Sequence, residues 1–88
     1  MIDETELDEK VEVVAIFRRS GLHVCQPLKF RFKNREVEIS EIGLSYPIRR
    51  NGSLTHCFDV SDGQADYRLE LNTLRLTWRV TREADHYD

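Results

Sequence analysis

Residues 28–42 read LKFRFKNREVEISEI, and this stretch decides the fold class. Apolar and charged residues alternate on both sides of a short polar break, which is the period-two pattern of a half-buried β-strand. A two-residue turn at Asn34–Arg35 would make one face of the hairpin apolar and the other a ladder of opposite charges. The predicted pairs are Lys33–Glu36, Phe32–Val37, Arg31–Glu38 and Phe30–Ile39.

The same pattern returns in residues 57–80, CFDVSDGQADYRLELNTLRLTWRV. A four-residue loop, Asp62–Ala65, would place Val60 opposite Tyr67. A turn at Asn72–Thr73 would join the next two strands. These three strands then share one apolar face, made of Phe58, Val60, Tyr67, Leu69, Leu71, Leu74, Leu76, Trp78 and Val80.

Two further segments complete the outline. Residues 11–19, VEVVAIFRR, are β-branched and aromatic and predict a strand that is covered on both faces. Residues 43–53 contain Pro47 and Asn51–Gly52 and are expected to be a loop. We therefore expect an all-β fold, a small antiparallel meander of five or six strands. It would close into a compact barrel or a two-sheet sandwich, and the barrel is preferred because closure removes exposed edges.

The chain has 88 residues, which fits one domain. Its formal net charge of −3 is unevenly spread, because residues 1–10 and 83–88 are acidic while residues 11–82 are mildly basic. We expect a flexible acidic tail at 1–10, a single β-domain at 11–82 and an acidic tail at 83–88. The tails would either keep the protein soluble or shield its basic body from anions.

No apolar run approaches the roughly 20 residues that span a membrane, and the N-terminus lacks the basic start and apolar run of a secretory signal. These patterns predict a cytoplasmic protein without a membrane partner. The two cysteines, Cys25 and Cys57, allow one disulfide, but two reduced, buried thiols are the favoured expectation.

Residues of about 27–80 include the series Pro27, Phe30, Phe32, Arg35, Val37, Ile42, Phe58, Val60, Asp62–Gly63, Tyr67, Leu69 and Trp78. This series resembles the pattern of a family of short bacterial all-β proteins of unknown function. The resemblance implies a β fold and no particular activity. The chain departs from the pattern at its first turn, where Lys33–Asn34–Arg35 stands in place of an expected glycine.

Motifs that carry chemistry are sparse. The sequence has no phosphate-binding glycine loop and no nucleophile elbow. Three residues are candidate metal ligands, His23, Cys25 and His56, but their spacing is not that of a zinc site. We expect no bound metal, no cofactor and no enzymatic activity.

Two arginine doublets have no acidic partner in the predicted hairpins. Arg18–Arg19 and Arg49–Arg50 lie at strand ends or in loops, and Tyr46 is close to the second doublet. If the doublets gathered at one rim, they would form a site for nucleic acid or another anion, with Tyr46 as a stacking platform.

The leading hypothesis is a non-catalytic binding or accessory module that acts through protein–protein contacts or self-association. An open sheet edge, for which strand 11–19 is the candidate, would accept the partner. The first alternative is a small nucleic-acid-binding barrel that uses the two arginine doublets. The second is a small metal or enzymatic site at His23, Cys25 and His56.

Overall fold

The computed structural model describes residues 4–20 and 24–85, which form seven antiparallel β-strands. The all-β prediction is confirmed, whereas the predicted count of five or six strands is too low. The strands are β1 (Glu4–Phe17), β2 (Cys25–Phe32), β3 (Arg35–Glu38), β4 (Glu41–Arg50), β5 (Ser53–Ser61), β6 (Ala65–Asn72) and β7 (Thr77–Asp85).

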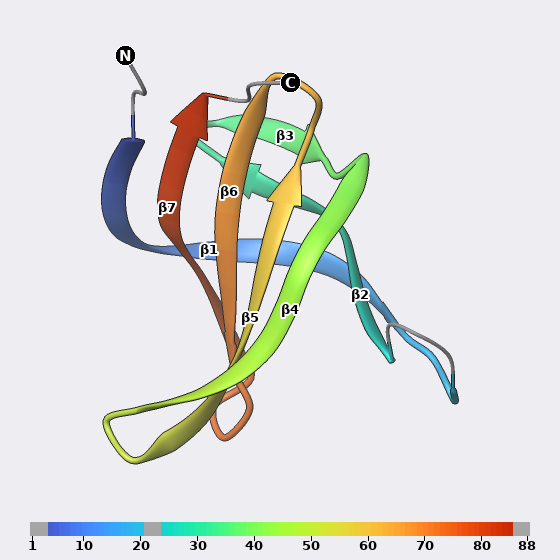
Figure 1. Ribbon diagram of the computed structural model, residues 1–88, viewed down its shortest axis with the longest axis vertical. Coiled ribbons are helices and arrows are strands. Elements are labelled where there is room, and N and C mark those ends of the chain that lie inside the picture. The colour runs from blue at the N-terminus through green and yellow to red at the C-terminus, as the bar shows by residue number, and fades with distance from the viewer. Residues whose placement is uncertain (1–3, 21–23, 86–88) are drawn as a thin grey trace.

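The strands make a single sheet in the order β3-β2-β1-β7-β6-β5-β4. Each strand therefore neighbours the next one along the chain, except that β1 pairs with β7 and β3 does not pair with β4. The sheet is an opened meander, and the prediction of a closed barrel or two separate sheets is wrong. Only Ile39 and Ser40 separate the two edge strands along the chain, so the sheet curls until its edges approach at that corner (Figure 1). Ile39 N donates to Leu28 O of β2 at 2.9 Å, and Ser40 N donates to Ser61 O of β5 at 2.8 Å.

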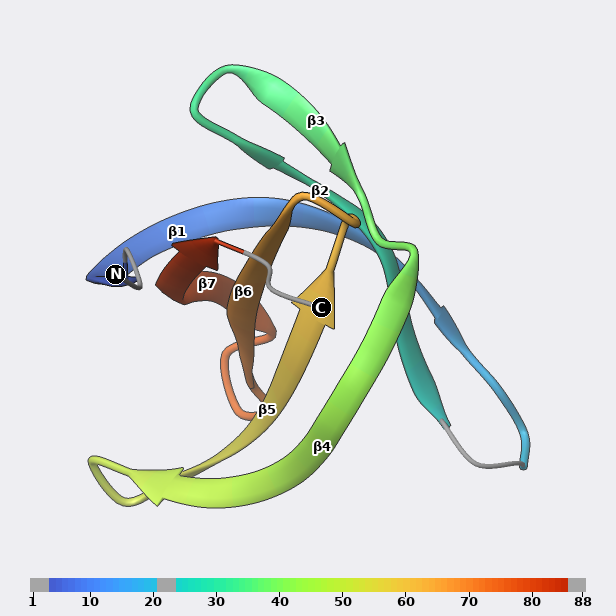
Figure 2. The ribbon, with the colours of Figure 1, turned by 45° about the horizontal axis from the view of Figure 1, so that its top comes forward.

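The long strand β1 explains how one sheet encloses a core. Residues Glu4–Val11 pair with β7, and residues Glu12–Phe17 pair with β2. The sheet changes direction along this strand, so β2 and β3 fold over the face of the other strands (Figure 2). Residues 4–10 are thus the first half of β1 and not a flexible tail, because they complete the ladder beside β7. At the other end β7 includes residues 83–85, and residues 1–3 and 86–88 lie outside the described residues.

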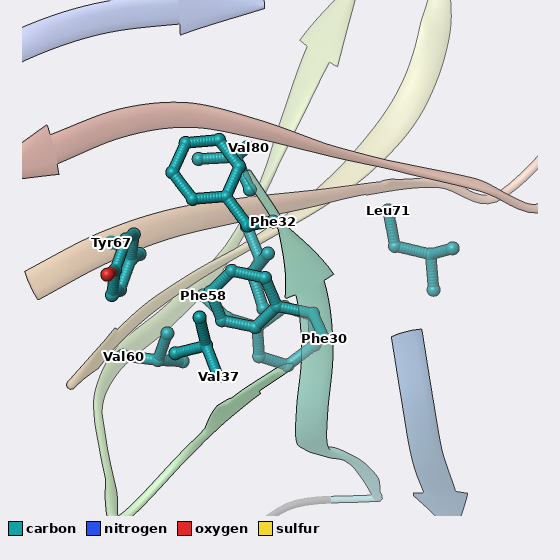
Figure 3. Close-up of a cluster of buried hydrophobic side chains, with 9 residues drawn as sticks. Phe30, Phe32, Val37, Phe58, Val60, Tyr67, Leu71 and Val80 are labelled. Carbon is teal, nitrogen blue, oxygen red and sulfur yellow. The ribbon is translucent and has the colours of Figure 1, made fainter. Parts of the chain in front are cut away.

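The core lies between the two parts of the curled sheet (Figure 3). The ring of Tyr67 meets the rings of Phe30 and Phe32 edge-on, at centroid distances of 5.2 and 5.9 Å. Burial of the predicted apolar face is confirmed for Phe58, Val60, Tyr67, Leu69, Leu71 and Val80. The prediction is wrong for Leu74 and Leu76, which are exposed.

The β2–β3 turn differs from the predicted one by one residue. Lys33 and Asn34 are the turn residues, with φ values of 52° and 61°, the left-handed pair that a type I′ turn requires. Phe30 therefore pairs with Val37, and the whole register is two residues away from the prediction. Because two residues is one full side-chain period, the apolar face is unchanged.

The β5–β6 hairpin has the predicted pairs, with Val60 opposite Tyr67. In the β6–β7 hairpin the turn is longer than predicted, and Asn72 pairs with Thr77. The reason is the Asn72 side chain, whose Oδ1 accepts hydrogen bonds from the backbone of Leu74 and Arg75. These hydrogen bonds stabilise a turn in which the side chains of Leu74 and Leu76 point into solvent.

The segment expected to be a loop, 43–53, is mostly strand. Residues 43–50 belong to β4, and only the Asn51–Gly52 turn is confirmed, with φ values of 52° and 79°. Pro47 is tolerated because β4 is an edge strand, where a missing N–H costs no ladder hydrogen bond.

Candidate functional site

The hairpin of β1 and β2 extends beyond the core as an arm, which we call the β1–β2 arm and define as residues 12–18 and 24–29 (Figure 2). Four of its apolar side chains are exposed. The exposed fractions are 50% for Val14, 39% for Ile16, 67% for Phe17 and 53% for Val24. The prediction that this strand is covered on both faces is wrong, because the core ends near Ala15 while the strand continues. A concentration of exposed apolar side chains on one projecting element is typical of an interaction surface.

The arm also has an open backbone edge. The pairing of β1 with β7 ends at Val11, and from Glu12 onward the described pairs of β1 are with β2 alone. The backbone groups on the other edge of Glu12–Phe17 are therefore available to another strand. Cross-strand pairs such as Glu12–Arg31 and Val14–Lys29 fix the arm in its register.

A second candidate site lies on the sheet face opposite the core. This face contains a concave, polar depression with a volume of about 900 Å³, which we call the polar trough. Its walls come from the first half of β1 and from the hairpins of β4 to β7. The lining residues are Glu6, Leu7, Asp8, Lys10, Arg50, Asn51, Ser53, Thr55, Arg68, Glu70, Asn72, Arg75, Thr77, Arg79 and Thr81.

A buried carboxylate, that of Glu70, lies at the floor of the trough. The side chain of Glu70 is only 5% exposed; its Oε2 accepts a hydrogen bond from Arg50 Nη2 at 3.1 Å, and its Oε1 forms an ion pair with Arg50 Nε at 2.9 Å. Thr81 Oγ1 donates a second hydrogen bond to Glu70 Oε2 at 2.8 Å. A buried carboxylate needs this complete set of donors, so Arg50 has a structural role here.

A second ion pair flanks the first. Arg68 Nε donates to Asp59 Oδ1 at 2.9 Å, and the pKa of Arg68 is raised chiefly by this hydrogen bond. The Arg68 guanidinium also lies over the ring of Tyr46, 6.0 Å from its centroid. One face of the Tyr46 ring is therefore covered by an arginine of the same chain.

The side of the trough formed by β1 is less tightly paired. Lys10 lies directly opposite Arg79 in the ladder, and Arg79 lies opposite Glu70. Arg79 Nη1 donates to Asp8 Oδ1 at 3.0 Å, but the Asp8 side chain is 75% exposed. This pair is thus a weak surface ion pair.

The predicted arginine site does not assemble as one surface. Arg18 and Arg19 follow β1 at the tip of the β1–β2 arm, and Arg49 and Arg50 end β4; these two ends point to different corners in both views (Figures 1 and 2). Arg18 donates to Gln26 Oε1 at 3.0 Å. Arg49 is exposed on the face of β4 opposite Arg50. Nucleic-acid binding by this chain stays a prediction.

The candidate metal ligands are likewise separate. Cys25 begins β2 and His56 lies on β5, where its Nε2 is 2.8 Å from Ser45 Oγ; His23 lies outside the described residues. Within residues 4–20 and 24–85, no group of three or more His, Cys, Asp or Glu side chains is placed to hold a metal ion.

Both cysteines are free thiols in the structure. Cys57 is buried, as predicted, and burial together with the nearby Glu70 charge raises its pKa to about 11. Cys25 is half-buried, and burial raises its pKa as well. A thiol with a raised pKa is a poor nucleophile at neutral pH.

Comparison with known proteins adds no relative: neither a family model, nor a curated protein, nor a solved structure matches the chain. The part of the chain that the structure describes has no helix long and apolar enough to cross a membrane. The candidate functional surfaces of the described residues are the β1–β2 arm and the polar trough.

The sequence did not predict the trough, because its arginines have acidic cross-strand partners in the predicted hairpins. The predicted hairpins place Asp59 opposite Arg68, Glu70 opposite Arg75 and Asp66 opposite Arg79, so none of these arginines stands out as a free cation. One signal was present: Arg68, Glu70 and Asn72 alternate with the buried side chains of β6, which places all three on one polar face. The curvature that makes this face concave has no signal in the sequence.

Proposed function

We propose that this protein is a non-catalytic interaction module whose β1–β2 arm binds a second copy of the chain, edge to edge. The observation that carries the proposal is the open edge of Glu12–Phe17 together with the exposed apolar side chains around it. Backbone hydrogen bonds across such an edge would supply affinity, and the side chains would supply specificity.

The arm's own sequence supports a second copy as the partner. Residues 12–18 read EVVAIFR, and antiparallel pairing of this segment with itself, centred on Ala15, makes every pair complementary. Glu12 of one copy lies opposite Arg18 of the other, so their charges attract. The remaining pairs are apolar, namely Val13–Phe17, Val14–Ile16 and Ala15–Ala15.

This pairing obeys two-fold symmetry, which is the commonest arrangement of homo-oligomers. It would join the β3-β2-β1 parts of two copies into one continuous six-stranded layer, in the order β3-β2-β1-β1-β2-β3. The contact is small compared with a stable interface of roughly 1,600 Å², so we expect reversible association in the micromolar range.

The test is sedimentation velocity of the full chain over about 1–200 µM, a range that brackets a micromolar dissociation constant. We expect a monomer–dimer equilibrium. Glu12→Arg places two arginines opposite each other and should weaken association at least about tenfold. Adding Arg18→Glu restores opposite charges and should recover the dimer.

Leu74→Lys is the matched control, because it places a charge on an exposed leucine of the β6–β7 turn, outside the arm. It should leave association unchanged. A chain that stays monomeric over the whole range would refute the proposal. A dimer that Leu74→Lys abolishes and Glu12→Arg leaves intact would place the interface elsewhere.

A further inference from the structure

The geometry points to the polar trough as a binding site for a small polyanion that carries phosphate or carboxylate groups. The residues that would hold it are Lys10, Arg75 and Arg79, at the side of the trough formed by β1, β7 and the β6–β7 turn. This site uses the first half of β1, whereas the β1–β2 arm uses the second half, so the two proposals stand independently.

The charge balance of the trough favours an anion. Of the described residues that line it, five are cations and three are carboxylates. Arg50 is held by Glu70, and Arg68 is held by Asp59 from outside the lining. Lys10 and Arg75 have no ion pair within 4.0 Å among the described residues, so their charges are available to a ligand.

Arg79 connects these two cations to the floor of the trough. It lies opposite Lys10 on one side and opposite Glu70 on the other. Its ion-pair partner, Asp8, is largely exposed and therefore easily displaced. A ligand oxyanion that replaced the Asp8 carboxylate would accept hydrogen bonds from the Arg79 guanidinium and would also be attracted by the charge of Lys10.

The lining also indicates the kind of anion. No aromatic side chain lines the described trough, so a nucleobase or sugar ring would find no stacking partner. Hydroxyl and amide groups, such as Thr77 and Asn72, stand beside the cations and suit oxyanions. A compact polyanion without a ring therefore fits better than a nucleotide or a nucleic-acid strand.

The test is isothermal titration calorimetry, in which the full chain is titrated with tripolyphosphate and, in parallel, with citrate. The buffer is low in salt and free of phosphate. The two ligands distinguish phosphate from carboxylate recognition. We expect saturable binding of at least one of them that weakens as salt is added. Arg75→Ala and Arg79→Gln should each weaken binding about tenfold or more, since each removes a charge-assisted contact.

Asp8→Asn gives a test in the opposite direction, because it removes the internal competitor and should strengthen binding several-fold. Arg49→Ala and Glu41→Gln are the matched controls; both residues are exposed on β4 outside the trough, and neither change should alter the affinity. Melting curves of each variant confirm that it is folded.

Absence of binding by both ligands to the folded wild-type chain overturns the inference. Binding that Arg75→Ala and Arg79→Gln leave intact overturns it as well. A single-stranded oligonucleotide is titrated last, and tight binding that is lost in Arg49→Ala and kept in Arg79→Gln would reassign anion binding to the arginine doublets.

Discussion

Arg50 and Glu70 form a two-point ion pair across an intervening strand, because Arg50 ends β4, Glu70 lies in β6, and β5 runs between them. The pair ties the tip of the edge strand β4 to the middle of the sheet. Since the Glu70 carboxylate is buried, the loss of Arg50 would leave a charge without its main partner.

We therefore expect Arg50→Ala to lower the free energy of unfolding by about 1–3 kcal/mol, discounted from a fully buried pair because the Arg50 side chain is itself half exposed. Urea denaturation measures the change. Arg49→Ala removes the same side chain from the opposite face of β4 and should stay within about 0.5 kcal/mol of wild type. Equal losses in the two variants would contradict the structural role of the pair.

Leu76 combines two unfavourable features, a left-handed backbone with φ of 57° and a side chain that is 73% exposed. Leu76→Gly should raise the free energy of unfolding by about 0.5–1 kcal/mol, because glycine adopts this conformation without strain and little burial is lost. Leu74→Gly, in the same turn but without positive φ, should lower stability instead. Thermal denaturation of the two variants measures these changes. A lower stability in both variants would show that the backbone of Leu76 is not strained.

The register of the β2–β3 hairpin is tested by charge reversal. Glu36 forms its ion pair with Lys29, at 3.2 Å, whereas the sequence pattern had predicted Lys33 as its partner. Glu36→Lys should cost about 0.2–1 kcal/mol, and the added change Lys29→Glu should recover it. Lys33→Glu should not recover it, because Lys33 pairs with Glu83 at 2.9 Å. A double-mutant cycle in urea measures both couplings.

The Cys57 thiol predicts a dependence of stability on alkaline pH. Its pKa in the folded protein is raised from 9.0 to about 11. Well below pH 9 the thiol is neutral in both states and has no effect; as the pH passes 9 and approaches 11 the unfolded chain ionises first, so stability falls as pH rises. The loss reaches at most roughly 2–3 kcal/mol.

Cys57→Ser removes this ionisation, so its free energy of unfolding should fall less steeply over the same pH range. Denaturation at pH 8, 9, 10 and 11 compares the slopes of the two proteins. Identical slopes would mean that the thiol of Cys57 ionises as readily in the folded protein as in the unfolded chain.

The predictions from sequence succeeded where a side chain had only to be placed on one of two faces. The alternation through Phe30, Phe32 and Val37 put all three on the buried face, although the turn was placed one residue too late. They failed where a turn was fixed by a local hydrogen bond, as at Asn72, whose side chain lengthens the β6–β7 turn and exposes Leu74. Periodicity carries no information about such bonds.

The two candidate sites were predictable to different degrees. The sequence pointed to strand 11–19 as a possible open edge, and β1 does carry one from Glu12 to Phe17. The gathering of Arg18–Arg19 with Arg49–Arg50 did not occur, because three strands separate β1 from β4 in the sheet and their ends lie at different corners (Figures 1 and 2). The distance between two strand ends depends on the curl of the sheet, which no local pattern encodes.

By itself the sequence determined the class of fold, the apolar face except for Leu74 and Leu76, and the Asn51–Gly52 turn, because each depends on neighbours within a few residues. The tertiary structure alone decided that β1 pairs with β7, that the sheet stays open between β3 and β4, and that Arg79 faces Asp8 across 71 positions of the chain. These are contacts between distant segments, and their free energy depends on how the whole sheet bends around its core.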